Sequence, residues 1–128
     1  ENILQIGIRQ ADQEENSIAE KNGIVTFDPW EIKSNIERVT EYISKVTNNR
    51  NIYISFDIDV YDIPYVPCTG TPEPFGLDPF EILKIIKSIN DSANLVGMNF
   101  FIFIGFVEVE KYTLIPGFAI ASPLPELK

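Results

Sequence analysis

Three aspartates stand close together in the stretch SFDIDVYDIPYVPCTGTPEPFGL, residues 55–77. Asp57, Asp59 and Asp62 follow an apolar run and precede a loop rich in Pro, Gly and Thr. If residues 52–58 form a strand, alternation places Asp57 and Asp59 on one face, with Cα atoms about 6.5 to 7 Å apart. Such a pair can bind one hard cation or bridge two, and all-oxygen ligation favours Mg²⁺ or Mn²⁺ over zinc. Alternatively the aspartates cap the loop that follows, because Asp is a common turn residue.

The composition limits the chemistry that this chain can perform. It has 128 residues, a net charge of -9 and no histidine. The acidic balance argues against binding to nucleic acid or to an anionic membrane, since both need a basic face. Without histidine the chain supplies neither a His-based catalytic triad nor an imidazole metal ligand. Its one cysteine, Cys68, excludes an intrachain disulfide and fits a reducing compartment, so we expect a cytoplasmic protein.

Strands and helices alternate around the acidic stretch. Apolar runs predict strands over 3–8, 24–27 and 52–58, and a polar segment predicts a surface helix over 11–22 that ends at Gly23. The alternation predicts an α/β fold, with a mainly parallel sheet and helices on both faces. Open sheets of this kind bind ligands at the carboxyl ends of their strands, which is where the aspartates stand.

Two helix starts use the same chemistry. Asp28 and Asp78 are each followed by proline, and a glutamate three residues after each aspartate completes a capping box. The first start predicts one helix to Asn48, with an apolar face of Ile32, Ile36, Val39, Ile43 and Val46. The second predicts a helix to Asn90, with an apolar face of Ile82, Ile85, Ile86 and Ile89. We interpret Trp30 and Phe80, next to the two prolines, as packing residues.

The C-terminal third is less regular. The apolar run 95–109 is too short to cross a membrane and too long for one average strand, so we expect a break near Gly97 or Gly105. The proline-containing end, 115–128, predicts a short helix or an irregular tail. Together the elements predict one domain over 1–128.

Residues 55–77 resemble the signature of the ureohydrolases, the arginase and agmatinase family, whose usual form is S-F-D-I-D-x-x-D-P-x-x-x-P-G-T-G-T-P-E-P-G-G. ILQIGIRQ, and LVGMN followed by VEV, resemble two further family segments. The resemblance covers most of this chain but only about the C-terminal half of a family member. It implies part of a three-layer α/β/α domain and a homo-oligomer of three or six subunits. It also implies hydrolysis of a guanidino compound, agmatine in preference to arginine, to urea and an amine.

The same resemblance implies roles for four residues. Asp57 and Asp59 would be ligands of a binuclear manganese centre that activates water for attack on the guanidinium carbon. Thr71 would lie beside the substrate. Glu108 would pair with the guanidinium group, because a carboxylate can accept two parallel hydrogen bonds from such a planar donor.

Several positions depart from the family pattern. The motifs that supply the other ligands, G-G-D-H and D-A-H-x-D, do not occur, so this piece by itself is expected to hold manganese weakly and to be inactive. Cys68 and Phe75 stand where the pattern has glycines, and we interpret Cys68 as a small apolar filler. We interpret Arg9, at the end of the first strand, as part of a surface or subunit-interface ion pair.

Two other functions are compatible with the residues. Asp57-Ile58-Asp59-Val60 resembles the nucleophile motif of haloacid-dehalogenase-like phosphatases, in which Asp57 would be phosphorylated and Asp59 would act as acid and base. The segment TGTPEP has no place in that motif. A non-catalytic remnant or assembly subunit is the other possibility, and it would form an oligomer whose stability does not depend on metal.

Overall fold

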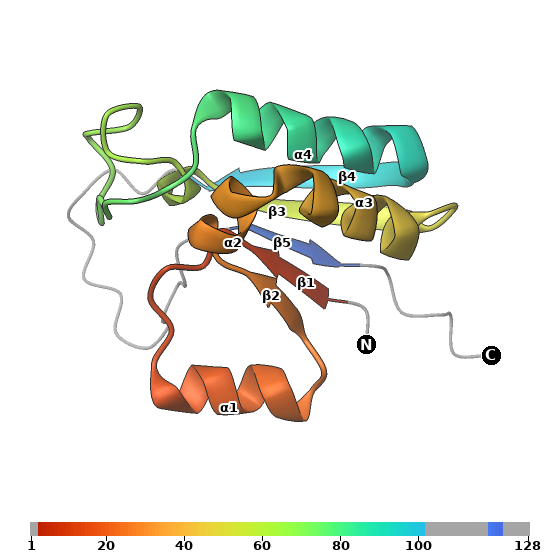
Figure 1. Ribbon diagram of the computed structural model, residues 1–128, viewed down its shortest axis with the longest axis horizontal. Helices are drawn as coiled ribbons and strands as arrows, with labels where there is room; N and C mark the ends of the chain where they lie inside the picture. Colours follow the sequence, from red (N-terminus) through yellow and green to blue (C-terminus); the bar gives the residue numbers. More distant parts are fainter. Residues whose placement is uncertain (1–2, 102–117, 122–128) are drawn as a thin grey trace.

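The computed structural model describes residues 3–101 and 118–121 (Figure 1). The helices are α1 (Gln13–Lys21), α2 (Pro29–Ser34), α3 (Ile36–Thr47) and α4 (Pro79–Ser92). The strands are β1 (Ile3–Ile6), β2 (Val25–Phe27), β3 (Asn51–Asp57), β4 (Asn94–Phe101) and β5 (Phe118–Ala121). A short 3-10 helix, η1 (Ile58–Val60), follows β3 directly.

The described strands form one sheet in the order β2-β1-β5-β3-β4. β1 pairs in parallel with β2, and β3 pairs in parallel with β4. β5 lies between β1 and β3 and runs antiparallel to both. The carboxyl ends of β1, β2, β3 and β4 therefore lie at the same end of the sheet. This arrangement confirms the predicted α/β fold with a mainly parallel sheet.

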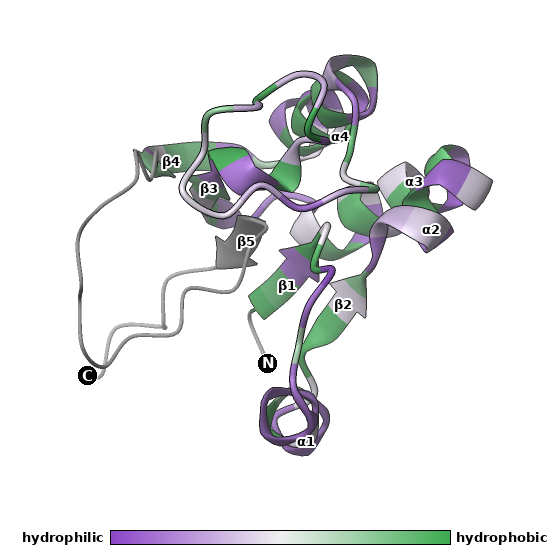
Figure 2. Ribbon diagram, turned by 90° about the vertical axis from the view of Figure 1, so that its left-hand side faces the viewer, coloured by the Kyte–Doolittle hydropathy of each residue, from purple (hydrophilic) through white to green (hydrophobic). Residues whose placement is uncertain are grey.

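The core lies between the sheet and the helices α2, α3 and α4. Figure 2 shows α3 and α4 on one side of the sheet and α1 on the other side, next to β1 and β2. Helical spacing correctly predicted the residues that are buried, namely Ile32, Val39, Ile43, Ile82, Ile85 and Ile89. The strands add alternate residues to the same core: Leu4, Ile6, Ile52, Ile54 and Phe56. Burying each such side chain contributes roughly 1.5 to 3 kcal/mol relative to leaving it exposed.

Both predicted capping boxes are present, but the first helix is not continuous. The Asp28 and Asp78 carboxylates accept hydrogen bonds from the backbone N–H groups of Glu31 and Glu81, at 2.7 and 2.8 Å. Asn35, at φ -160° and ψ 76°, interrupts the helix that we expected to continue to Asn48. Its side chain accepts a hydrogen bond from the N–H of Arg38 and so starts α3 anew. Asn side chains compete with the backbone in this way, which is why they favour helix ends.

The C-terminal expectations need correction. β4 continues through Gly97 to Phe101, so no break occurs there. Gly97 instead marks a shift in the register between β3 and β4, where an added Cβ would lie 2.9 Å from Cε2 of Tyr53. Gly105 lies outside the described residues. Residues 118–121 form a strand, and not the expected short helix or irregular tail, because β1 and β3 offer backbone partners on both sides.

Three side chains expected in packed positions are exposed. Trp30 and Phe80 expose 80% and 65% of their surface, so the packing interpretation is wrong for both. At each helix start the core is reached two residues later, by Ile32 and Ile82. Cys68 is also exposed, and it is not an apolar filler. No helix in the described part of the chain is long and apolar enough to cross a membrane.

Candidate metal and substrate site

Asp57 and Asp59 lie at the carboxyl end of β3, as predicted, but they do not share a strand face. β3 ends at Asp57, and Asp59 belongs to η1. The Asp57 side chain helps to start this turn, because its Oδ1 accepts a hydrogen bond from the N–H of Asp59 at 3.1 Å. The 3-10 turn, and not the pleat of a strand, therefore sets the orientation of the second carboxylate.

Asp59 has one paired and one unpaired carboxylate oxygen. The residue is 4% exposed, and its Oδ2 accepts a hydrogen bond from Oγ1 of Thr71 at 2.6 Å. Its Oδ1 is buried and has no hydrogen-bond partner among the described atoms. A buried carboxylate oxygen without a partner is costly unless a proton or a cation neutralises it.

The Asp57 carboxylate is half-buried and lies in a negative environment. Burial raises its pKa, and the negative charge of Asp59 raises it further. The hydrogen bond from Asp59 N–H and the positive charge of Arg9 act in the opposite direction. A cation placed between the two carboxylates would lower the cost of keeping both ionised.

Of the other two predicted site residues, Thr71 joins the aspartates and Glu108 lies outside the described residues. The Thr71 residue is exposed, yet its hydroxyl reaches the buried Asp59 carboxylate. Its contact with a substrate and the role of Glu108 both stay predictions.

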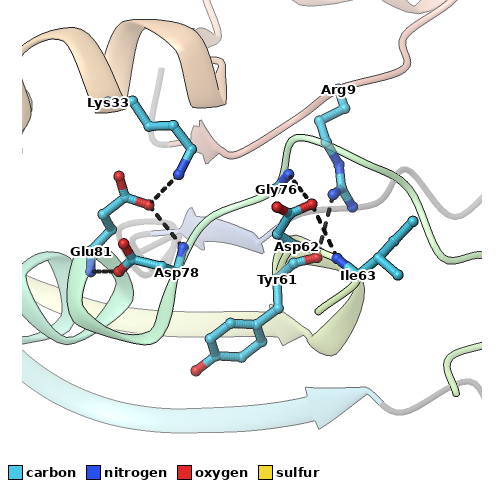
Figure 3. A network of polar contacts seen from close by, with 8 residues as sticks. All are labelled: Arg9, Lys33, Tyr61, Asp62, Ile63, Gly76, Asp78 and Glu81. Atoms are coloured by element: carbon cyan, nitrogen blue, oxygen red, sulfur yellow. Dashed lines mark hydrogen bonds and ion pairs between the residues drawn. The ribbon is translucent and has the colours of Figure 1, made fainter. Parts of the chain in front are cut away.

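The base of the loop after η1 is closed by backbone pairing. The N–H of Asp62 donates to the carbonyl of Leu77 at 3.0 Å, and the N–H of Leu77 donates to the carbonyl of Val60 at 2.9 Å. The Asp62 carboxylate adds bonds from the N–H groups of Ile63 and Gly76, at 3.1 and 3.2 Å (Figure 3). The third aspartate of the motif therefore shapes the loop and is not directed to a ligand.

Arg9 is a site neighbour that the sequence interpretation missed. Its Nη1 donates to the carbonyl oxygens of Glu73 at 2.6 Å and Tyr61 at 3.3 Å, and its Nη2 donates to the carbonyl oxygen of Asp59. Figure 3 shows its side chain reaching from the segment after β1 to the loop. Among the described residues Arg9 therefore contacts backbone carbonyls and forms no surface ion pair, while an ion pair at a subunit interface stays a prediction. Burial lowers the pKa of the guanidinium, and nearby carboxylates, first that of Glu73, oppose this shift.

The donor set fits a hard cation in part. Asp57 and Asp59 offer the carboxylate oxygens that Mg²⁺ or Mn²⁺ prefers, and no described residue pairs with Oδ1 of Asp59. Among the described residues, however, no three or more His, Cys, Asp or Glu side chains gather where they could hold a metal ion. The described residues can therefore supply some ligands of a metal centre but not a complete set.

Comparison with known proteins places the chain beside one group of enzymes. The family described as the Arginase family matches residues 1–109. The arginase of Plasmodium berghei is 39% identical over 103 residues, which are 77% of this chain and 29% of that protein. The agmatinase of Chromobacterium violaceum is 38% identical over 71 residues, which are 56% of this chain and 22% of that protein. The chain thus spans less than a third of the length of these relatives.

Solved structures agree with the sequence matches. A hypothetical agmatinase from Burkholderia thailandensis superimposes with a TM-score of 0.67 and 27% identity, covering 79% of this chain and 30% of that one. A putative agmatinase from Clostridium difficile gives a TM-score of 0.65 and 32% identity, covering 79% of this chain and 35% of that one.

Proposed function

This chain belongs to the arginase family, and we propose that it supplies two manganese ligands and a substrate-facing loop to a ureohydrolase site. The remaining ligands would come from residues outside this sequence, in a longer chain or in a partner. The proposed reaction is the hydrolysis of a guanidino compound to urea and an amine.

The observation that carries this proposal is the unpaired oxygen of Asp59. Oδ1 is buried and finds no partner among the described residues, while Oδ2 is held by Thr71, and the half-buried carboxylate of Asp57 lies two residues away. Two partly desolvated carboxylates at the carboxyl end of a parallel strand favour a bound cation over an empty site.

The proposed roles follow from these contacts. Asp57 and Asp59 hold manganese, which when bound supplies Lewis-acid activation of water for attack on the guanidinium carbon. The Thr71 hydroxyl fixes the Asp59 carboxylate, so that Oδ1 is the oxygen left to coordinate. We also propose that Glu108 accepts hydrogen bonds from the guanidinium group.

The names of the relatives support a guanidino compound as the substrate class. They include arginase, agmatinase and the N(1)-aminopropylagmatine ureohydrolase of Thermus thermophilus, which is 29% identical over 101 residues. We favour agmatine over arginine as the finer proposal. The net charge of -9 suits the approach of a cationic substrate.

The test measures urea release by the full chain in which these residues occur in the cell. Wild type is compared with Asp59→Asn and with Asp91→Asn, an exposed aspartate of α4 that serves as the control. We expect wild-type activity that is lost on chelation and restored by Mn²⁺. Asp59→Asn, and not the control, should lose activity by at least about a hundredfold, because loss of a metal ligand costs more than the 10- to 100-fold typical for a residue that only hydrogen-bonds to a ligand. Full activity in Asp59→Asn would refute the assignment.

The family match replaces the phosphatase alternative, because the matched region contains Asp57, Asp59 and the whole of TGTPEP. The assembly role is the other outcome of the same test. A stable oligomer without activity, and with no response to Mn²⁺, would support it. The trimeric or hexameric state and the cytoplasmic location stay predictions.

A further inference from the structure

Arg9, in the segment that follows β1, contacts the loop that carries the proposed site. We propose that Arg9 is a positioning residue, whose guanidinium fixes the backbone around Asp59 and Thr71 so that the Asp59 carboxylate is oriented for manganese. The link to manganese rests on the function proposed above. The contact between Arg9 and the loop is observed in the structure and does not depend on that function.

The three acceptors of Arg9 lie on both sides of the loop. The Asp59 carbonyl belongs to η1, the Tyr61 carbonyl to the start of the loop, and the Glu73 carbonyl to its returning half. A guanidinium can serve all three because it is planar, charged and carries five N–H donors in a fixed arrangement. Lysine has one compact ammonium group and cannot reproduce this geometry.

Gly76 provides independent support for this contact. An added Cβ would lie 2.5 Å from Nη1 of Arg9, and equally close to backbone atoms of Tyr61 and Asp62. Because contacts under about 3 Å are not tolerated, glycine is required at this position both for the two sides of the loop to pair and for the guanidinium to lie against them. The sequence therefore provides both the donor, three residues after the end of β1, and the space that the donor needs, 67 residues later.

The guanidinium constrains both ends of the hydrogen bond between Thr71 and Asp59. It holds the Asp59 end through that residue's carbonyl oxygen. It holds the Thr71 end through the carbonyl of Glu73, two residues further along the chain. Without the guanidinium, Thr71 and Asp59 could move apart and their hydrogen bond would be lost. Oδ2 of Asp59 would then be free for other partners, and Oδ1 would no longer be the oxygen selected for the metal.

The direct electrostatic effect of Arg9 has the opposite sign. A positive charge near two carboxylates weakens the binding of a cation by repulsion. If Arg9 acted through its charge alone, its removal would strengthen manganese binding. If it acts by position, removal weakens binding, so the direction of the change separates the two roles.

The experiment compares Arg9→Met and Arg9→Lys with Arg38→Met in the full chain. Arg38 is an exposed arginine of α3 whose partner is Glu31, so it controls for the loss of a positive charge. Bound Mn²⁺ is measured from the electron paramagnetic resonance signal of the free ion, and kcat and KM from urea release. We expect Arg9→Met to weaken Mn²⁺ binding about 10- to 100-fold and to lower kcat more than it changes KM. Arg9→Lys should be intermediate, and Arg38→Met unchanged.

A second readout needs neither metal nor activity. In metal-free protein, limited proteolysis should cut Arg9→Met within residues 61–77 about tenfold faster than wild type, because three fewer bonds hold the loop. Gly76→Ala should also be cut faster, because the added Cβ would clash with the guanidinium and with the backbone at the base of the loop. If Arg9→Met does not fold, Arg9→Lys decides by the same measurements.

The outcomes separate the two proposals. A folded Arg9→Met with wild-type proteolysis, Mn²⁺ affinity and kcat would overturn the positioning role, as would tighter Mn²⁺ binding. Faster proteolysis with unchanged Mn²⁺ affinity and kcat would also overturn it, because the contact would then be structural only. A wild-type protein that neither binds Mn²⁺ nor releases urea would refute the proposed function, whatever the proteolysis shows.

Discussion

Thr71 donates a hydrogen bond from Oγ1 to Oδ2 of Asp59, 2.6 Å away and twelve residues earlier in the chain. The bond joins the TGTP segment of the loop to the short helix that follows β3. It satisfies one oxygen of a buried carboxylate, and the other oxygen has no partner within residues 3–101 and 118–121. The threonine that family resemblance placed beside a substrate is thus also the residue that orients the proposed metal ligand.

Removing the Thr71 hydroxyl should therefore weaken Mn²⁺ binding. We expect Thr71→Val, which keeps the branched shape, to lose about tenfold in Mn²⁺ affinity, since hydrogen bonds to charged groups contribute about 1.5 to 3 kcal/mol. Thr71→Ser keeps the hydroxyl and should stay within about threefold of wild type. Isothermal titration with Mn²⁺ distinguishes them. Equal affinity in both variants would mean that the bond does not orient Asp59.

Asp57→Asn should stabilise the metal-free protein while it removes the response to Mn²⁺. Burial raises the pKa of Asp57 above the ordinary 3.8. Between that value and the raised one the folded protein binds more protons than the unfolded chain, so the free energy of unfolding falls as the pH rises. Asparagine cannot ionise, so the variant avoids the cost of a buried negative charge at neutral pH. Its Oδ1 can still accept a hydrogen bond from the N–H of Asp59, so this bond is kept.

The measurement is the thermal midpoint at two pH values. At pH 7 the metal-free variant should unfold at a higher temperature than wild type. At about pH 3, where the carboxyl is protonated in both states, the difference should vanish. Asp91→Asn is the control, because a hydrogen bond from Lys87 lowers the pKa of Asp91 instead of raising it. This variant should therefore not unfold at a higher temperature than wild type at pH 7. A midpoint for Asp57→Asn at or below wild type at pH 7 would contradict this account.

Local signals in the sequence were enough to predict two helix starts and the buried helix faces, but not the interruption at Asn35. The capping boxes at Asp28 and Asp78 depend on residues three positions apart, and the buried faces of α3 and α4 follow from helical spacing. β5 could not be predicted in this way. Its four residues become a strand because β1 and β3, distant in sequence, pair with them.

The candidate site was predicted by residue type but not by geometry. The motif identified Asp57 and Asp59, yet the strand ends between them and alternation no longer applies. The contacts of Arg9 with the loop were not predicted, because its partners are backbone carbonyls 50 to 64 residues away. Any residue type offers a backbone carbonyl, so a contact of this kind leaves no pattern in the sequence.

Gly7→Ala should destabilise the protein more than Gly23→Ala does. Both glycines have positive φ, 78° and 65°, where a side chain adds about 1 to 2 kcal/mol of strain. At Gly7 an added Cβ would also lie 2.6 Å from Cγ2 of the buried Val60, whereas nothing lies within 4 Å of the corresponding point at Gly23. Overpacking at Gly7 should add about 1 to 3 kcal/mol. Urea unfolding measures both variants, and equal losses would show that the neighbouring η1 moves aside at no cost.

Phe75 and Cys68 both stand where the ureohydrolase pattern has glycine, but only one of them is strained. Phe75 has φ 65°, and its side chain is 80% exposed, so the strain is not offset by burial. Among the described residues other than glycine, positive φ occurs at Asn49 and Phe75 and not at Cys68. The loop has therefore kept the glycine conformation at position 75 after losing the glycine.

Replacement by glycine should consequently have opposite effects at the two positions. Phe75→Gly removes about 1 to 2 kcal/mol of strain, and the greater freedom of glycine in the unfolded chain costs about 0.4 to 1 kcal/mol of stability. The free energy of unfolding should therefore rise by about 0.8 kcal/mol at the middle of these ranges and by about 1.6 kcal/mol at most. Cys68→Gly only increases the conformational freedom of the unfolded chain, so it should lower the free energy of unfolding by about 0.4 to 1 kcal/mol. Paired urea unfolding curves test the signs. A loss of stability in Phe75→Gly similar to that in Cys68→Gly would show that Phe75 makes contacts that outweigh its strain.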